Sequence, residues 1–139
     1  MAYPDHSPGV RFWRKFVTSD TGCWLWTGPL TRKGYGRFKV ADKPIQAHRW
    51  AYAYLRGPIP EGLTIDHLCR MRHCVNPRHM EVVTSRENTL RGFGVAAQYA
   101  RRAHCKYGHL FDVANTRYGR NGARICRACD RRRHKIWPA

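Results

Sequence analysis

Two groups of cysteine and histidine residues in this chain have the spacing of metal ligands. In the first group, Cys69, Cys74 and His79 follow one another with four residues between neighbours, inside the segment TIDHLCRMRHCVNPRH. Three ligands fix a tetrahedral ion only when a fourth completes the set, and Cys23 is the remaining cysteine of this half of the chain. We therefore predict a structural zinc site formed by these four residues. The alternatives are a buried Cys23 that binds no metal and ligation by His73 in place of His79.

The second group lies near the carboxyl end, where CKYGH and CRAC are separated by an Asn-Gly pair, a strong hairpin signal. A treble-clef zinc finger has a zinc knuckle, a hairpin and a Cys-x-x-Cys that runs into a helix, in this order. Here the knuckle is CKYGH (residues 105–109), and the helix is basic and starts at about Ala128. We predict a second zinc site here, with His104 and His134 as alternative imidazoles and with the ligands Cys105, His109, Cys126 and Cys129. A redox role for Cys-x-x-Cys would need a βαβ context that the sequence lacks.

Both predicted zinc ions are structural, because four protein ligands leave no open position for a reacting water. Disulfides are the alternative use of six cysteines, but the first ten residues have neither the charged region nor the apolar region of a signal peptide. We therefore expect a cytoplasmic chain with reduced thiols. No apolar run approaches the roughly 20 residues of a spanning helix, so we expect no membrane partner.

Three residues near the first group are left without a role in zinc binding: Asp66, His67 and Asn88. Oxygen atoms of Asp66 and Asn88 are suitable ligands for a hard cation such as Mg²⁺. His67 can then act as a base toward a water molecule, and a base combined with a metal ion cleaves phosphodiesters. Taken alone, a structural histidine and a local helix cap are the alternative interpretations of these residues.

Periodicity predicts the elements that position these side chains. A short aromatic helix is expected within residues 9–19, and strands are expected within GCWLWTG and GYGRFKV. The segment IQAHRWAYAYLRGP has the apolar spacing of an amphipathic helix, in which His48 is interpreted as structural. GLTIDHLC and MEVVT read as two strands around the ligand-rich loop. Thr84 and Glu87 form a capping box, which starts a helix at Ser85 that runs to about Arg91.

These elements indicate an α+β fold, a small domain stabilised by zinc and followed by a treble-clef-like zinc finger. We place the main domain at residues 1–92, a linker opened by Gly92 and Gly94 at 93–102, and a basic zinc-finger module at 103–139. We find no internal repeat and no low-complexity block.

The charge of the chain indicates a polyanionic partner. Lysine and arginine number 26 against 9 acidic residues, a formal net charge of +17. A solvated basic surface is the alternative interpretation of such an excess. The residues that we expect to contact backbone phosphates are Arg37, Lys39, Arg70, Arg72, Arg86, Arg131, Arg132 and Arg133.

The segment IDHLCRMRHCVNPRHMEVVTSRENTLRG resembles the HNH and His-Cys box endonucleases of the His-Me finger group, most of all small phage-type HNH enzymes. Weaker likeness extends over roughly residues 8–92. The resemblance implies a ββα-metal motif in which His67 is the general base and Asp66 and Asn88 hold one Mg²⁺ or Mn²⁺. It also implies a structural zinc bound by Cys23, Cys69, Cys74 and His79 and a loop-shaping role for Asn76. The helix carries Asn88 where a strict HNH motif has a second histidine, so this is an HNN variant.

The expected function is therefore metal-dependent hydrolysis of DNA that leaves 5′-phosphate and 3′-hydroxyl ends, in the cytoplasm of a bacterial host if the chain is phage-encoded. Nicking by a monomer and double-strand cutting by a homodimer are both compatible with the sequence. The alternative is a non-catalytic zinc protein that binds DNA or RNA. It explains the charge and the cysteines, but not Asp66, His67 and Asn88 in register.

Overall fold

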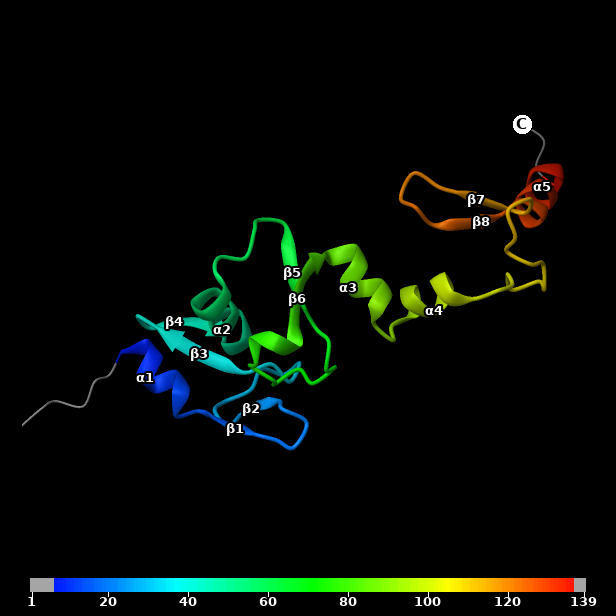
Figure 1. Cartoon of the computed structure of the whole chain (residues 1–139). Coiled ribbons are helices and arrows are strands. Elements are labelled where there is room, and N and C mark those ends of the chain that lie inside the picture. The colour runs from blue at the N-terminus through cyan, green and yellow to red at the C-terminus, as the bar shows by residue number, and fades with distance from the viewer. Residues whose placement is uncertain (1–6, 137–139) are drawn as a thin grey trace, which may run out of the picture. The chain divides into compact units, whose positions relative to one another are not determined.

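The structure, a computed structural model, describes residues 7–136, with side chains described as far as residue 133. It divides into two compact units, Met1–Asn88 and Thr89–Ala139. Each unit combines helices with short antiparallel two-stranded ribbons (Figure 1). The chain is therefore a small α+β protein, as predicted. Within the described residues, no helix has both the length and the apolar character needed to cross a membrane.

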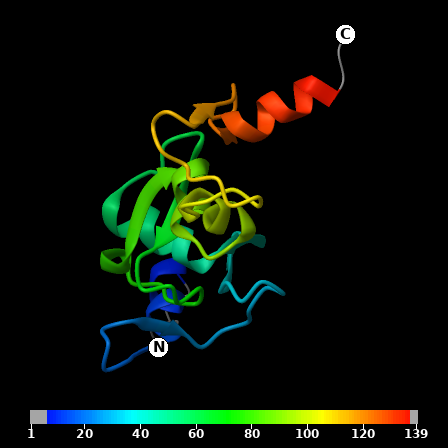
Figure 2. The same cartoon turned by 90° about the vertical axis from the view of Figure 1, so that its right-hand side faces the viewer.

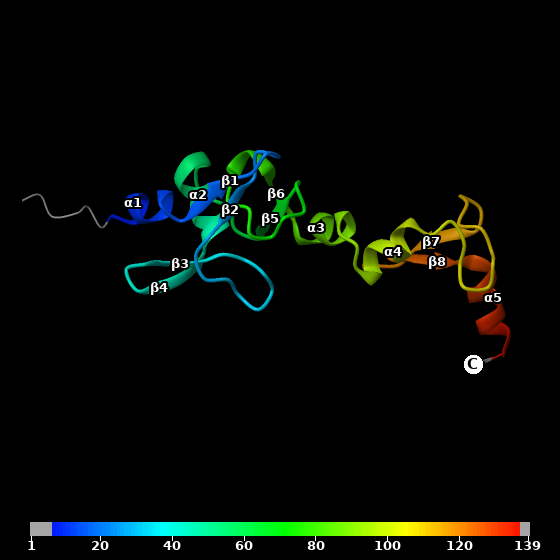
Figure 3. The ribbon, with the colours of Figure 1, turned by 90° about the horizontal axis from the view of Figure 1, so that it is seen from below.

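The first unit begins with helix α1 (Pro8–Trp13), strand β1 (Phe16–Thr18) and strand β2 (Trp24–Trp26). Figure 3 shows these elements from below. Ser7 caps α1, because its hydroxyl accepts a hydrogen bond from the Val10 N–H at 3.4 Å. The helix predicted within residues 9–19 therefore ends earlier than that window. Residues 16–18 of the same window form strand β1, which pairs with β2 and which the sequence analysis did not predict.

A second ribbon leads into the long helix of this unit. Strand β3 (Arg37–Val40) pairs with β4 (Lys43–Gln46), and α2 (Ala47–Arg56) follows directly (Figure 1). Ala41 and Asp42 connect the strands with φ of 45° and 60°, the left-handed conformation of a tight two-residue hairpin turn. The amphipathic helix thus lies where its apolar spacing predicted it, and its carboxyl end is set by Gly57 at φ 109°.

An aromatic cluster forms the core of the first unit. Phe12 is fully buried, and its ring centroid lies 4.6 Å from that of Trp50 and 5.4 Å from that of Trp26. Gly36 allows Trp26 to pack here, because a Cβ at that position would come within 2.8 Å of the indole. This core joins α1 and α2 to both ribbons. It gives the following hairpin a fixed support.

The last part of the first unit is a hairpin followed by a helix. Strand β5 (Leu63–His67) pairs with β6 (Met80–Thr84), the 3₁₀ turn η1 (Pro77–His79) precedes β6, and α3 (Ser85–Arg91) follows it. The Thr84 hydroxyl accepts from the Glu87 N–H at 3.1 Å, and the Glu87 carboxylate accepts from the Thr84 N–H at 2.9 Å. This reciprocal capping box fixes where α3 begins, as predicted.

The second unit contains α4 (Val95–Arg101), strands β7 (Thr116–Tyr118) and β8 (Arg124–Cys126), and α5 (Arg127–Ile136). Figure 2 shows the β7–β8 hairpin leading straight into α5. Arg117 holds the two together through an ion pair with Asp130, at 2.6 and 2.9 Å. Residues 93–102, which we expected to act as a linker, contain the helix α4. The helix predicted from about Ala128 starts one residue earlier.

Candidate metal centres and active site

The structure brings the first group of predicted ligands together. The ligand atoms of Cys23, Cys69, Cys74 and His79 all lie within 4.8 Å of one another. His79 presents Nδ1, which lies 3.3 Å from the Cys23 Sγ and 3.8 Å from the Cys74 Sγ. Three thiols and one imidazole at this separation suit tetrahedral zinc. His73, the alternative imidazole, is not in the cluster.

Backbone hydrogen bonds explain how Cys23 reaches a loop so distant in sequence. Strand β2 pairs with the loop through Trp26 N–H to His73 O at 3.0 Å and Val75 N–H to Trp24 O at 2.8 Å. Asn76 adds a buried side-chain link, because its amide donates to the Gly22 carbonyl at 2.8 Å and its Oδ1 accepts from the Arg78 N–H. These bonds agree with the loop-shaping role expected for Asn76.

The thiols of the first cluster are in a site that disfavours their charged form in the absence of a cation. Burial raises the pKa of the Cys74 thiol to about 12 and raises the pKa of the Cys69 thiol above its usual value. A bound divalent ion reverses this preference, because metal ligation requires the thiolate. The fold of this loop and ion binding are therefore coupled.

His67 is held in one orientation by the same loop. It is 6% exposed at the end of β5, and its Nε2 lies 3.0 Å from the Cys74 carbonyl oxygen. A carbonyl only accepts, so Nε2 carries the proton and Nδ1 keeps the lone pair of a base. Burial lowers the pKa of His67, although the Cys74 hydrogen bond and the Asp66 carboxylate oppose this. The imidazole is therefore neutral at pH 7.

Asp66, the neighbour of His67, is 3% exposed and forms an ion pair with Arg70 at 2.6 Å. A guanidinium cation thus already lies against the carboxylate that we expected to bind a hard metal ion, so the surroundings of Asp66 accept positive charge. Arg70 is also one of the residues expected to contact a backbone phosphate, and that contact stays a prediction beside its ion pair with Asp66. Its φ of 59° is a left-handed conformation, uncommon for arginine, at the start of the ligand loop.

His48 is a residue that the sequence analysis left as structural and that the structure places beside His67. It is 4% exposed in α2, its ring centroid lies 4.7 Å from that of His67, and Tyr35 lies 5.3 Å away. Burial, reinforced by the charges of His67 and Arg49, lowers the pKa of His48 to about 3. His48 is buried in α2 together with Ala47 and Ala51. Its place among these small apolar residues was the sequence signal that could have indicated a buried histidine.

The depressed pKa of His48 predicts a specific loss of stability in acid. Because the folded-state pKa lies below the unfolded value near 6.5, the unfolded chain binds the extra proton as the pH falls through this range. The free energy of unfolding should drop by about 1.4 kcal/mol per pH unit from this residue between about pH 6 and 4. Urea denaturation of His48→Leu should show a correspondingly shallower acid slope than wild type. Parallel slopes for the two proteins would contradict the assignment.

The other predicted site residues lie on the surrounding elements. Asn88 is half-buried in α3, directly after Glu87 of the capping box. Arg37 and Lys39 are exposed on β3, and Arg86 is exposed on α3. Arg72 donates to the Lys33 carbonyl at 3.2 Å, and its guanidinium lies 6.0 Å from the Tyr35 ring centroid.

The second group of ligands also converges. The ligand atoms of Cys105, His109, Cys126 and Cys129 lie within 4.8 Å of one another. His109 Nδ1 is 3.4 Å from the Cys105 Sγ and 3.3 Å from the Cys129 Sγ. His104 is not in this cluster, and the side chain of His134 lies outside the described residues. All six cysteines are free thiols.

Asn115 supports the second cluster, a role that the sequence analysis missed. Its amide nitrogen donates to the Leu110 carbonyl at 2.6 Å and to the Cys126 Sγ at 3.3 Å. Its Oδ1 accepts from the Ala128 N–H at 2.9 Å, at the start of α5. One side chain therefore links the knuckle, a ligand and the helix. Asparagine before a short strand gave no distinctive pattern in the sequence.

The geometry thus defines a β5–β6 hairpin followed by a helix, with a Cys/His cluster in the connecting loop and a buried imidazole at the end of β5. A sequence model of the HNH endonuclease family matches residues 46–90, from the start of α2 to α3. The chain is also 30% identical over 84 residues to the uncharacterized gene 5.3 protein of Enterobacteria phage T3, which covers 55% of this chain and 83% of that protein. The chain belongs to the HNH endonuclease family.

Two proteins of Escherichia phage T7 are further relatives. Protein 7.7 is 37% identical over 67 residues, 48% of this chain and 52% of that protein. Protein 2.8 is 36% identical over 77 residues, 54% of this chain and 52% of that protein. The chain therefore spans about half the length of each of these two relatives. No solved structure matches the chain.

Proposed function

We propose that the chain is a divalent-metal-dependent endonuclease that hydrolyses DNA phosphodiester bonds. The observation that carries this proposal is the 3.0 Å contact between His67 Nε2 and the Cys74 carbonyl, within the segment that matches the HNH family. This contact fixes the tautomer in which Nδ1 is the base. His67 also lies next in sequence to the buried carboxylate of Asp66, the residue proposed to hold the divalent ion.

The β5–β6 hairpin and α3 serve in this proposal as a ββα-metal motif. Asp66 and Asn88 offer a carboxylate and an amide oxygen, the donors that Mg²⁺ or Mn²⁺ prefers. The Arg70 guanidinium against Asp66 supports the fit, because it is a cation at the proposed ligand. When bound, the divalent ion supplies charge stabilisation for the phosphate and the leaving oxygen.

The chain's own residues then have distinct tasks. His67 Nδ1 takes a proton from the attacking water while the Cys74 carbonyl keeps the ring oriented. In-line attack on phosphorus with departure of the 3′ oxygen leaves 5′-phosphate and 3′-hydroxyl ends. One active site cuts one strand, so a monomer nicks duplex DNA and a homodimer cuts both strands. Arg37, Lys39, Arg72 and Arg86 are proposed to contact backbone phosphates without reading sequence.

The two Cys/His clusters are proposed to hold structural zinc. Zinc in the first cluster would stabilise the catalytic loop, and zinc in the second would stabilise a treble-clef-like finger that adds affinity. In domain terms we propose a nuclease core at residues 1–92, a connecting segment at 93–102 and a basic zinc module at 103–139. The place of action is the cytoplasm of the bacterial host, since the relatives are phage proteins.

Supercoiled plasmid incubated with the purified chain tests this function. We expect conversion to nicked or linear forms with Mg²⁺ or Mn²⁺ and none with zinc alone. Asn88→Ala should raise the Mg²⁺ concentration needed for half-maximal rate at least tenfold, since even outer-shell metal partners contribute about 10- to 100-fold. Thr89→Ala, an exposed change on the same helix, is the matched control. A wild type that binds DNA but cuts with no divalent metal would leave only the non-catalytic binding alternative.

A further inference from the structure

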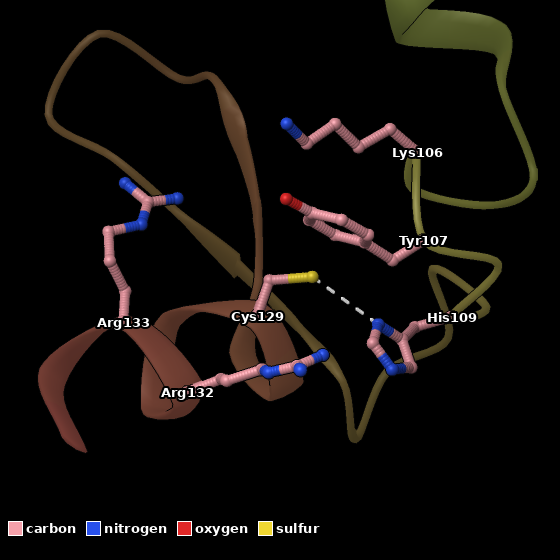
Figure 4. A pocket seen from close by; sticks show the side chains of 6 residues that line it. All are labelled: Lys106, Tyr107, His109, Cys129, Arg132 and Arg133. Carbon is pink, nitrogen blue, oxygen red and sulfur yellow. Dashed lines mark hydrogen bonds between the residues drawn. The ribbon is translucent and has the colours of Figure 1, made fainter. Parts of the chain in front are cut away.

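A basic hollow beside the second Cys/His cluster has no role in the proposed cleavage. Its volume is about 460 Å³, and its lining residues are Lys106, Tyr107, His109, Cys129, Arg132 and Arg133. Figure 4 shows Lys106 and Tyr107 extending from the knuckle on one side and the two arginines from α5 on the other, with Cys129 between them. The second Cys/His cluster therefore joins the two walls of this hollow, because His109 and Cys129 come from opposite sides of it.

The side chains of Lys106, Tyr107, Arg132 and Arg133 that line the hollow all end in hydrogen-bond donors. Lys106 Nζ lies 4.7 Å from the ring centroid of Tyr107, whose side chain is 62% exposed. The Tyr107 hydroxyl and the Lys106 amine extend in the same direction into the hollow (Figure 4). A phenol, an ammonium and two guanidinium groups are all hydrogen-bond donors at neutral pH. Such a set matches the oxygens of a phosphate.

The positive charge of the hollow is not neutralised by the protein. Among the described residues, Lys106, Arg132 and Arg133 form no ion pair. The two acids of this unit lie elsewhere: Asp130 pairs with Arg117, and Asp112 accepts from the Asn115 N–H at 2.6 Å. Arg131, which the sequence grouped with its two neighbours, does not line the hollow. A ligand that enters therefore meets three uncompensated cations.

The knuckle fixes this geometry close to the metal cluster. The Tyr107 N–H donates to the Cys105 Sγ at 3.4 Å, and Gly108 adopts φ +82° at the turn. His109 and Cys129 join the two walls through the 3.3 Å contact of their ligand atoms. Because Tyr107 lies between two ligands in sequence, its backbone is immobilised whenever the cluster is intact. The backbone that carries Lys106 and Tyr107 is thus held in place before a ligand binds, which reduces the entropy lost on binding.

We propose that this hollow is a phosphate-binding site for the nucleic-acid backbone, formed by Lys106, Tyr107, Arg132 and Arg133. This inference rests on the proposed function for its ligand class. It assigns the second unit a defined backbone contact and separates Arg132 and Arg133 from Arg131. The site binds a backbone phosphodiester and contacts no base, so it should contribute equally to the binding of every DNA sequence.

The experiment measures binding of the full chain to a labelled DNA duplex in the His67→Ala background without added divalent ion. Lys106→Gln, Arg132→Gln and Arg133→Gln should each reduce the slope of log affinity against log salt by about 1. Tyr107→Phe should weaken binding by about two- to tenfold through loss of one hydroxyl donor. Arg120→Gln, an exposed change in the β7–β8 turn, should leave the slope unchanged. Zinc content confirms that each variant is folded.

Two outcomes would overturn the site. One is a salt-dependence slope equal to that of the wild type in all three charge variants that retain their zinc. The other is an equal reduction of the slope by Arg120→Gln, which would mean that binding depends on net charge alone. Inorganic phosphate provides a further arm: competition at millimolar concentration beyond that of chloride at equal ionic strength would show a free-anion site instead. These readouts do not depend on strand cleavage, so the proposed nuclease activity and the phosphate site can fail separately.

Discussion

His67→Ala should reduce plasmid cleavage by about 10²- to 10⁴-fold, the range contributed by a positioned general base. The reason is local, because His67 Nδ1 is the nitrogen left without a proton once Nε2 donates to the Cys74 carbonyl. Rates are to be measured under single-turnover conditions at saturating DNA, so that binding does not contribute. His73→Ala is the matched control, since this loop histidine is not in the metal cluster. A loss of similar size in both variants would contradict the role of His67.

The pH dependence of the same rate is a second measure of the base. Burial lowers the pKa of His67 below its usual value, and general-base catalysis requires the neutral form. The rate should therefore be nearly constant above pH 6.5 and should fall by about tenfold per pH unit below the folded-state pKa. A fall in rate centred above pH 6.5 would indicate a different titrating group. His67→Ala should remove this limb from the residual rate.

Local patterns predicted the parts of the fold that are set by neighbouring residues. The apolar spacing of residues 47–56 predicted α2, and the Thr84–Glu87 pair predicted the start of α3, because both depend on contacts within one turn. Strands β1 and β4 were not predicted, because residues 16–18 fall in the window interpreted as a helix and Ile45 and Gln46 fall in the segment interpreted as the amphipathic helix. Helix α4 followed two glycines, which indicated a linker.

The candidate site divides in the same way. The spacing of three ligands within one loop predicted the first cluster, and Cys23 was predicted as its fourth member because a tetrahedral site needs four ligands. The contact of His48 with His67 and the pairing of Arg70 with Asp66 depend on how α2 packs against the hairpin and on a left-handed residue in the loop. Neither is encoded in sequence spacing. The hollow at the second cluster likewise needed the orientation of α5 against the knuckle.

Cys74→Ser should unfold the first unit, the largest stability change expected in this chain. Structural zinc contributes an apparent ~10–16 kcal/mol in zinc-finger peptides, comparable to or above the ~5–15 kcal/mol that stabilises a typical domain. Cys74 is fully buried, and its neighbour Val75 is bonded to β2. Its carbonyl also orients His67. If zinc occupies the first cluster as proposed, its loss removes the support of both this loop and the proposed base His67.

Tryptophan fluorescence in a Trp137→Phe background measures this unfolding, because the other four tryptophans, Trp13, Trp24, Trp26 and Trp50, all belong to the first unit. We expect Cys74→Ser to lose one zinc per chain, the cooperative thermal transition of these tryptophans and all cleavage. Cys126→Ser, the matched change in the second cluster, should also lose one zinc but should keep the tryptophan transition while its affinity for DNA falls. The contrast follows from two clusters that each close a separate unit. A Cys74→Ser protein with two zinc ions and an unchanged transition would show that the first cluster does not support the fold.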